Sequence, residues 1–146
     1  MRKQKNIQFA PPFVGREEIE AVTRVIKSGW LGMGPETIAF EKEFAEYCGA
    51  EHAIAVNSCT SGLFFSLLTL NLKQDDEVIT TPFTFAATAN IIEHAGAKVI
   101  FADIDPNTLN IDPKSVEQKI TAKTRACIVV HYGGQIADMD SFRLLE

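Results

Sequence analysis

Two N-terminal segments place apolar residues every three or four positions, the spacing that puts them on one helix face. The pattern predicts helices over residues 17–28 and 36–47, each followed by a glycine, Gly29 and Gly49, where helices commonly end. We expect their apolar faces to enter the core through Ile19, Val22, Val25, Ile26, Ile38, Phe40, Phe44 and Tyr47. The loop between the helices, residues 29–35, carries Trp30 and Met33 among glycines, which predicts a mobile loop with large apolar side chains.

Short apolar runs alternate with helical patterns over the rest of the chain. Strands are predicted over residues 53–56, 77–80, 98–101 and 126–130, and helices over residues 60–70, 85–94, 113–120 and 139–146. This alternation is typical of βαβ units, which build an α/β fold around a mostly parallel sheet. Ligands of such sheets bind beyond the carboxyl ends of the strands. The residues that follow Val56, Thr80, Phe101 and Val130 are therefore the candidates for a functional site.

Composition narrows the class of protein. The 146 residues suffice for one domain with one core. A net charge of -5 and a pI near 5.2 argue against a general nucleic-acid binder, which needs a basic face. No apolar run approaches the roughly 20 residues of a membrane span, and the basic, polar residues 1–8 do not resemble a secretory signal. Three cysteines without metal-ligand spacing are typical of reduced thiols, so we expect a cytoplasmic protein.

The segment after the first predicted strand, residues 57–62, reads Asn-Ser-Cys-Thr-Ser-Gly and opens a helix. Free backbone N–H groups and the dipole at a helix start attract anions, and the hydroxyls of Thr60 and Ser61 can donate as well. The simpler interpretation is an ordinary N-cap, because Ser and Thr favour that position without any ligand. The segment is neither a P-loop nor a dinucleotide fingerprint.

Aromatic residues follow two of the other strands. Phe83 and Phe85 come after Thr80, where they either stack on a planar ligand or belong to the core, and the core is the commoner outcome. His131 and Tyr132 leave the last predicted strand into a Gly-Gly turn. A histidine there is either a general base or hydrogen-bond donor, or a structural residue with its own partner.

Two aspartates, Asp103 and Asp105, follow the third strand. Paired carboxylates can bind a metal ion or exchange protons, but Pro106 and Asn107 follow directly and favour a solvated turn. No metal site is therefore expected. Asp112 before Pro113 has the pattern of an N-cap followed by proline in the first helical turn.

Taken together, the motifs resemble the DegT/DnrJ/StrS family of sugar aminotransferases in order and spacing, over nearly the whole chain. The resemblance rests on Gly29-Trp30 to Gly34-Pro35, Phe40-Glu41, residues 57–63, residues 76–79, Pro82-Phe83-Thr84-Phe85 with residues 87–90, Gly96-Ala97, residues 103–105, residues 110–112 and residues 130–133. It implies a three-layer fold type I enzyme that depends on pyridoxal 5′-phosphate. Residues 1–146 correspond to the N-terminal part of its large domain.

The resemblance also implies roles for particular residues. Cys59, Thr60 and Ser61 would hold the cofactor phosphate, and Phe85 would stack on the pyridine ring. Candidate substrate-binding residues are Trp30, Met33, His131 and Tyr132. The substrates would be a nucleotide-linked keto sugar and an amino-acid donor such as glutamate, in surface polysaccharide, lipopolysaccharide or amino-sugar biosynthesis. Family members are usually homodimers.

The resemblance places the remaining catalytic groups elsewhere. The lysine that forms the Schiff base, the aspartate that pairs with the pyridine nitrogen and the small C-terminal domain are expected beyond Glu146, and none of the lysines here matches the family lysine. We expect the 146-residue chain alone to be inactive, with a gap in its sheet where later strands would lie. Two alternatives stay open: a sugar dehydratase with histidine in place of that lysine, and a non-catalytic remnant or interaction module.

Overall fold

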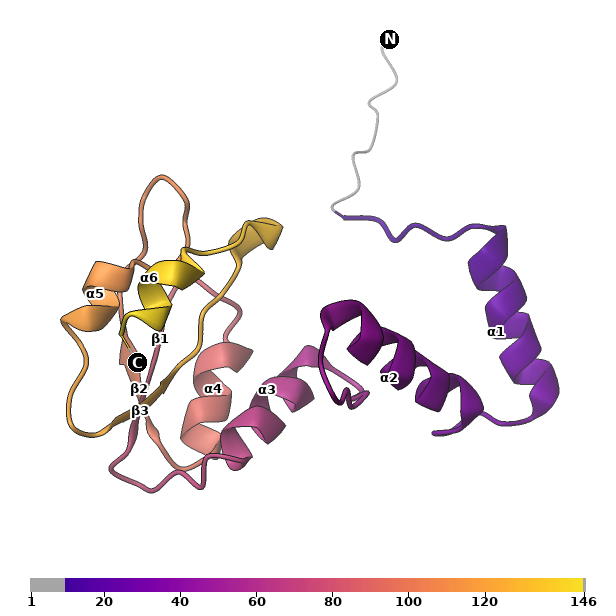
Figure 1. Cartoon of the computed structure of the whole chain (residues 1–146), viewed down its shortest axis with the longest axis horizontal. Coiled ribbons are helices and arrows are strands. Elements are labelled where there is room, and N and C mark those ends of the chain that lie inside the picture. Colours follow the sequence, from indigo (N-terminus) through magenta and orange to yellow (C-terminus); the bar gives the residue numbers. More distant parts are fainter. Residues whose placement is uncertain (1–9, 146) are drawn as a thin grey trace, which may run out of the picture. The chain divides into compact units, whose positions relative to one another are not determined.

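The computed structural model describes residues 10–145, which leaves residues 1–9, including the basic N-terminal segment 1–8, and Glu146 outside the described part. The chain divides into two units, Met1–Ala55 and Val56–Glu146 (Figure 1). Among residues 10–145, no helix combines the length and apolarity that crossing a membrane requires.

The first unit consists of two helices and their connections. Helix α1, Arg16–Ser28, and helix α2, Pro35–Cys48, lie within one residue of their predicted bounds. Gly29 and Gly49 follow them with φ angles of 74° and 66°, in the left-handed region where glycine pays no Cβ penalty. The predicted stop signals are therefore confirmed.

The predicted core of this unit is wrong. The four apolar candidates of α2 are 50–89% exposed, and no residue of the fully described α1 is buried. Ala45 is the one buried residue of α2. An amphipathic helix buries its apolar face only where another element covers it. The described part of this unit contains no sheet to do so.

The second unit is built on a three-stranded parallel sheet. Its strands are β1, Glu77–Thr80, β2, Lys98–Phe101, and β3, Thr124–Cys127, in the order β2-β1-β3. Ile79 in the central strand pairs with Ile100 on one side and Cys127 on the other. The prediction of a mostly parallel sheet is confirmed for these strands.

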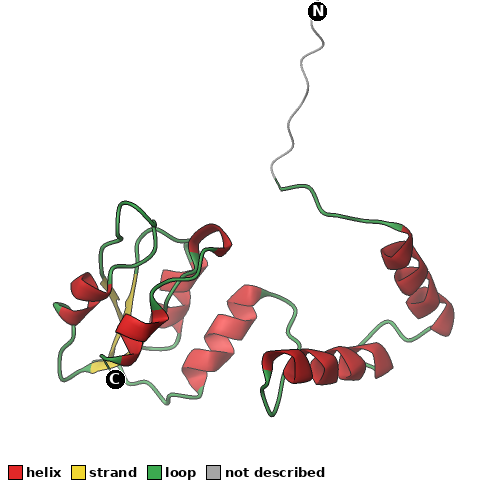
Figure 2. Cartoon of the chain, turned by 45° about the horizontal axis from the view of Figure 1, so that its top comes forward, coloured by secondary structure: helices red, strands yellow, loops and turns green. Residues whose placement is uncertain are grey.

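Helices cover both faces of this sheet, as Figures 1 and 2 show. Neighbouring strand residues point to opposite faces, so Val78 and Ile79, both 0% exposed, enter separate cores. Val78 packs with α3, Cys59–Leu68, and α4, Ala87–His94. Ile79 packs with α5, Pro113–Glu117, and α6, Met139–Arg143. The result is the three-layer α/β arrangement predicted from the sequence.

Residues 53–56 do not form the predicted strand. A strand requires a neighbour with which to exchange backbone hydrogen bonds. The N–H of Ala55 instead donates to the Glu41 carboxylate at 2.8 Å, and Ile54 is 80% exposed. Within the described residues, the sheet therefore has three strands rather than four.

Other boundaries shift by a few residues. β3 begins two residues before and ends three residues before the predicted 126–130, although the N–H of Ile128 still donates to the Ile79 carbonyl. Helix α5 ends at Glu117 instead of near Ile120, because only its Val116 is buried and the residues after it are exposed. Helices α3, α4 and α6 are also shorter than predicted. A single 3-10 turn, Tyr132–Gly134, follows β3.

Candidate functional site

The start of helix α3 combines a capped end with free donors. Ser58 is its N-cap: the Ser58 hydroxyl accepts the N–H of Ser61 at 3.1 Å, and the Ser58 carbonyl accepts the N–H of Gly62 at 3.1 Å. Helix geometry leaves the first N–H groups without intrahelical acceptors. The N–H groups of Cys59 and Thr60 therefore remain for a ligand.

The hydroxyls of this turn are not equivalent. The Ser61 hydroxyl donates to the Asn57 side-chain oxygen at 2.7 Å and lies 2.9 Å from the Ser58 hydroxyl. Within residues 10–145 the exposed Thr60 hydroxyl makes no hydrogen bond. The cap interpretation is confirmed for Ser58, and the N–H groups of Cys59 and Thr60 beside it are not used by the cap. Thr60 is the side chain that is ready to donate.

Aromatic residues surround a hollow beyond the carboxyl end of β1. Residues 82–85 and 130–133 line this hollow, whose volume is about 460 Å³. The rings of Phe83 and Tyr132 pack with centroids 4.6 Å apart. Phe85 is 81% exposed, so the core interpretation is wrong for this residue. The structure thus brings three of the predicted residues, Phe85, His131 and Tyr132, to one hollow.

His131 has one nitrogen committed to the backbone. Its Nδ1 accepts the N–H of Ala137 at 3.1 Å. A nitrogen that accepts a hydrogen bond carries no proton, so the neutral ring has its hydrogen on Nε2. The structural role of this histidine is therefore compatible with that of a hydrogen-bond donor, because Nδ1 holds the loop and the Nε2–H remains a donor. In this tautomer no free nitrogen is left to act as a general base.

Asn110 is a functional candidate to which the sequence analysis assigned no role. Its side chain is buried, with 4% exposed, and lies between the turn after β2 and the loop after β3. Its Oδ1 accepts the N–H of Tyr132 at 2.8 Å, and its Nδ2 donates to the Gln135 carbonyl at 3.2 Å. The only signal for it in the sequence is its place in the motif of residues 110–112.

The aspartates after β2 stabilise a turn. Asp105 accepts the N–H groups of Asn107 and Thr108, and these hydrogen bonds lower the pKa of its carboxyl. Asp112 caps α5 through the N–H of Lys114 at 3.0 Å, as predicted. Among the described residues, no group of three or more His, Cys, Asp and Glu side chains could hold a metal ion.

The remaining candidates, Trp30 and Met33, belong to the first unit. The Trp30 indole N–H donates to the Met33 carbonyl at 2.8 Å, which closes the loop onto itself. The indole also lies against Gly34, where an added Cβ would approach the ring nitrogen to 2.1 Å. The glycine is therefore needed for this packing.

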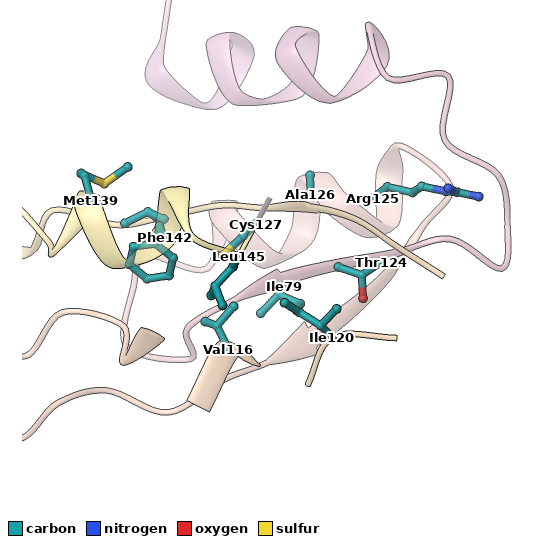
Figure 3. Close-up of a pocket in the computed structure, with 11 residues that line it drawn as sticks. Ile79, Val116, Ile120, Thr124, Arg125, Ala126, Cys127, Met139, Phe142 and Leu145 are labelled. Atoms are coloured by element: carbon teal, nitrogen blue, oxygen red, sulfur yellow. The ribbon is translucent and has the colours of Figure 1, made fainter. Parts of the chain in front are cut away.

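A second hollow, of about 480 Å³, lies between β3, α5 and α6 (Figure 3). Phe142 and Leu145 border it on the α6 side and Val116 on the α5 side, while Arg125 extends away from this group. Its lining is mainly apolar and includes core residues. Burial there raises the pKa of the Cys127 thiol to about 11, so this cysteine is not a nucleophile at neutral pH. The candidate residues Phe85, His131 and Tyr132 line the other hollow.

The backbone is closely similar to those of solved sugar aminotransferases. The putative sugar aminotransferase Spr1654 from Streptococcus pneumoniae, in its PLP-form, is 34% identical, with a TM-score of 0.90 over 96% of this chain and 36% of that chain. Helicobacter pylori PseC, an aminotransferase involved in the biosynthesis of pseudoaminic acid, is 34% identical, with a TM-score of 0.87 over 97% of this chain and 38% of its own. The fold is that of the PLP-dependent aminotransferases.

The chain belongs to the DegT/DnrJ/EryC1/StrS aminotransferase family, whose model matches residues 12–146. The spore coat polysaccharide biosynthesis protein SpsC of Bacillus subtilis (strain 168) is 53% identical over 141 residues, 94% of this chain. The match covers 36% of SpsC, so the chain spans about a third of the length of that relative. The family resemblance drawn from the sequence is confirmed.

Proposed function

We propose that the protein containing this chain is a pyridoxal 5′-phosphate-dependent aminotransferase that acts on a nucleotide-linked keto sugar, with glutamate as the amino donor. The observation that carries the proposal is the start of α3, where Ser58 caps the helix but leaves the N–H groups of Cys59 and Thr60 and the Thr60 hydroxyl available. A phosphate dianion suits such a site because the helix dipole and the N–H groups both favour negative charge.

The residues of the second unit fit the cofactor in charge and in shape. Thr60 and the N–H groups at the start of α3 would hold its phosphate, and the exposed ring of Phe85 offers a flat apolar surface to its pyridine ring. When bound, pyridoxal 5′-phosphate supplies the electron sink for amino-group transfer. The residues of this chain bind and orient it, and Tyr132 and His131 line the hollow as candidates for substrate contacts.

The substrate class rests on the family and on the relatives. SpsC is named for spore coat polysaccharide biosynthesis and PseC for pseudoaminic acid biosynthesis, which supports a sugar substrate and a role in polysaccharide or lipopolysaccharide biosynthesis. A cytoplasmic homodimer fits the acidic composition and the family. The proton-transferring lysine is proposed to lie beyond Glu146, because none of the lysines here matches the family lysine.

The experiment uses the protein expressed from the complete reading frame that contains residues 1–146. It is incubated with pyridoxal 5′-phosphate, a panel of nucleotide-linked keto sugars and ¹⁵N-labelled glutamate, and the products are analysed by mass spectrometry. The proposal predicts a sugar amine that carries the label. Loss of a hydroxyl without incorporation of nitrogen would identify a dehydratase, and absence of both reactions across the panel would refute the proposal.

A further inference from the structure

The loop between β3 and α6 is held by a side chain from another part of the unit. Residues 131–135 contain two consecutive glycines, Gly133 and Gly134, whose φ angles of 60° and 82° lie in the left-handed region. Glycine-rich turns have high conformational entropy when they are free, so a fixed conformation needs outside contacts. Asn110, which is 22 and 25 residues away from its two partners, supplies those contacts.

The Asn110 amide uses both of its ends. Its oxygen accepts the N–H of Tyr132 at 2.8 Å, and its nitrogen donates to the carbonyl of Gln135 at 3.2 Å. Asn110 is itself fixed, because its carbonyl accepts the N–H of Asp105 at 2.9 Å and its side chain is buried. The turn after β2 thus holds the loop that follows β3, the strand at the opposite edge of the sheet.

The hydrogen bond between the Tyr132 N–H and Asn110 holds the part of the loop that lines the hollow. The Tyr132 ring packs against Phe83, and both residues line the hollow with Phe85 and His131. At the other end of the loop, the N–H of Ala137 fixes the His131 ring. Along the chain, the contacts of Asn110 at Tyr132 and Gln135 therefore lie between His131 and Ala137, whose hydrogen bond fixes the imidazole ring.

We infer that Asn110 is a positioning residue that fixes Tyr132 and His131 for ligand binding at this hollow; the inference rests on the proposed function. An amide suits this position because it accepts from an N–H through its oxygen and donates to a carbonyl through its nitrogen at the same time. Aspartate of the same length accepts but does not donate, and alanine does neither. The phosphate site at the start of α3 does not involve Asn110.

The test compares Asn110→Ala and Asn110→Asp in the complete protein with Gln118→Glu, which makes the same amide-to-carboxylate change at an exposed position. Three quantities are measured: the dissociation constant of pyridoxal 5′-phosphate, that of inorganic phosphate, and hydrogen exchange in peptides covering residues 77–80 and 131–137. Loss of a buried hydrogen bond predicts a pyridoxal 5′-phosphate dissociation constant about three- to tenfold higher in Asn110→Ala. Phosphate affinity and the protection of residues 77–80 stay as in wild type, while residues 131–137 exchange faster.

Asn110→Asp distinguishes the two hydrogen bonds, because it keeps the acceptor for the Tyr132 N–H and removes the donor to the Gln135 carbonyl. It also replaces the alanine variant in the test if that variant does not fold. It should keep the Tyr132 amide protected and weaken pyridoxal 5′-phosphate binding less than alanine does. Unchanged pyridoxal 5′-phosphate affinity and exchange in both variants would overturn the inference, and so would an equal loss of phosphate affinity with faster exchange at residues 77–80. A wild-type protein that binds neither phosphate nor the cofactor would overturn the proposed function and this role with it.

Discussion

Replacing Thr60 by valine removes the hydroxyl at the start of α3 that the described residues leave unused, while it keeps the size and branching of the side chain. Ser58 and Ser61 do not offer the same test, because their hydroxyls already have partners. The Ser58 hydroxyl accepts the N–H of Ser61, the two hydroxyls bond to each other, and the Ser61 hydroxyl donates to the Asn57 side chain. The substitution therefore separates phosphate binding from helix capping. These are the two interpretations that the sequence alone could not distinguish.

The magnitude follows from the partners involved. A hydrogen bond to a charged group contributes about 1.5–3 kcal/mol, so Thr60→Val should weaken pyridoxal 5′-phosphate binding roughly 10- to 100-fold. Stability should change by less than about 0.5 kcal/mol, because the residue is exposed and Thr and Val have similar helix propensities. Ser58→Ala should instead cost about 1 kcal/mol of stability through loss of the cap.

The assays are an absorbance titration with pyridoxal 5′-phosphate and thermal unfolding, both on the complete protein. Thr60→Ser keeps the hydroxyl and is the matched control, with affinity close to wild type. The reasoning is refuted if Thr60→Val binds the cofactor as tightly as Thr60→Ser. A valine variant that unfolds as readily as Ser58→Ala would also contradict it, since Thr60 would then have a structural role.

Three further changes test the description of the two units. Hydrogen bonds from the N–H of Lys73 and from Arg125 lower the pKa of Asp76 in the folded state below its ordinary value of 3.8. The stability that this carboxylate provides is therefore present above the ordinary pKa and is lost as pH falls through the lower folded pKa. Urea unfolding of Asp76→Asn at several pH values should no longer show this loss at acid pH. Gly34→Ala should displace the Trp30 indole. Because the 146-residue chain has a single tryptophan, its fluorescence emission should shift to the red, and unchanged emission would contradict the contact. Ile79→Ala should destabilise the second unit by about 2–5 kcal/mol in urea unfolding, and a change below about 1 kcal/mol would mean that Ile79 is not central to its core.

Local signals were sufficient where a segment's own residues decide its structure. The bounds of β1 and β2 and the glycine stops of α1 and α2 matched the sequence prediction, because turn residues and glycines border these elements directly. The solvated turn at Asp105 was also predictable, since an aspartate side chain bonds to the N–H groups that follow it.

The structural features that the sequence did not predict depend on contacts between residues that are distant along the chain. Residues 53–56 have the composition of a strand but lack a neighbouring strand within the described part, and composition cannot report a partner. The exposed faces of α1 and α2 were predicted as core for the same reason. Asn110 was recognised only through its bonds to Tyr132 and Gln135, which lie far along the chain. The family resemblance supplied what local patterns could not, namely the proposal that pyridoxal 5′-phosphate is the ligand at the start of α3.

The most direct test of the account is a crystal structure of the complete protein with pyridoxal 5′-phosphate bound. We predict a phosphate oxygen within hydrogen-bond distance of the Thr60 hydroxyl and of the N–H groups of Cys59 and Thr60. The pyridine ring should lie against Phe85, with Tyr132 and His131 at the same hollow. A cofactor phosphate bound away from the start of α3, or a ring that does not contact Phe85, would contradict the account.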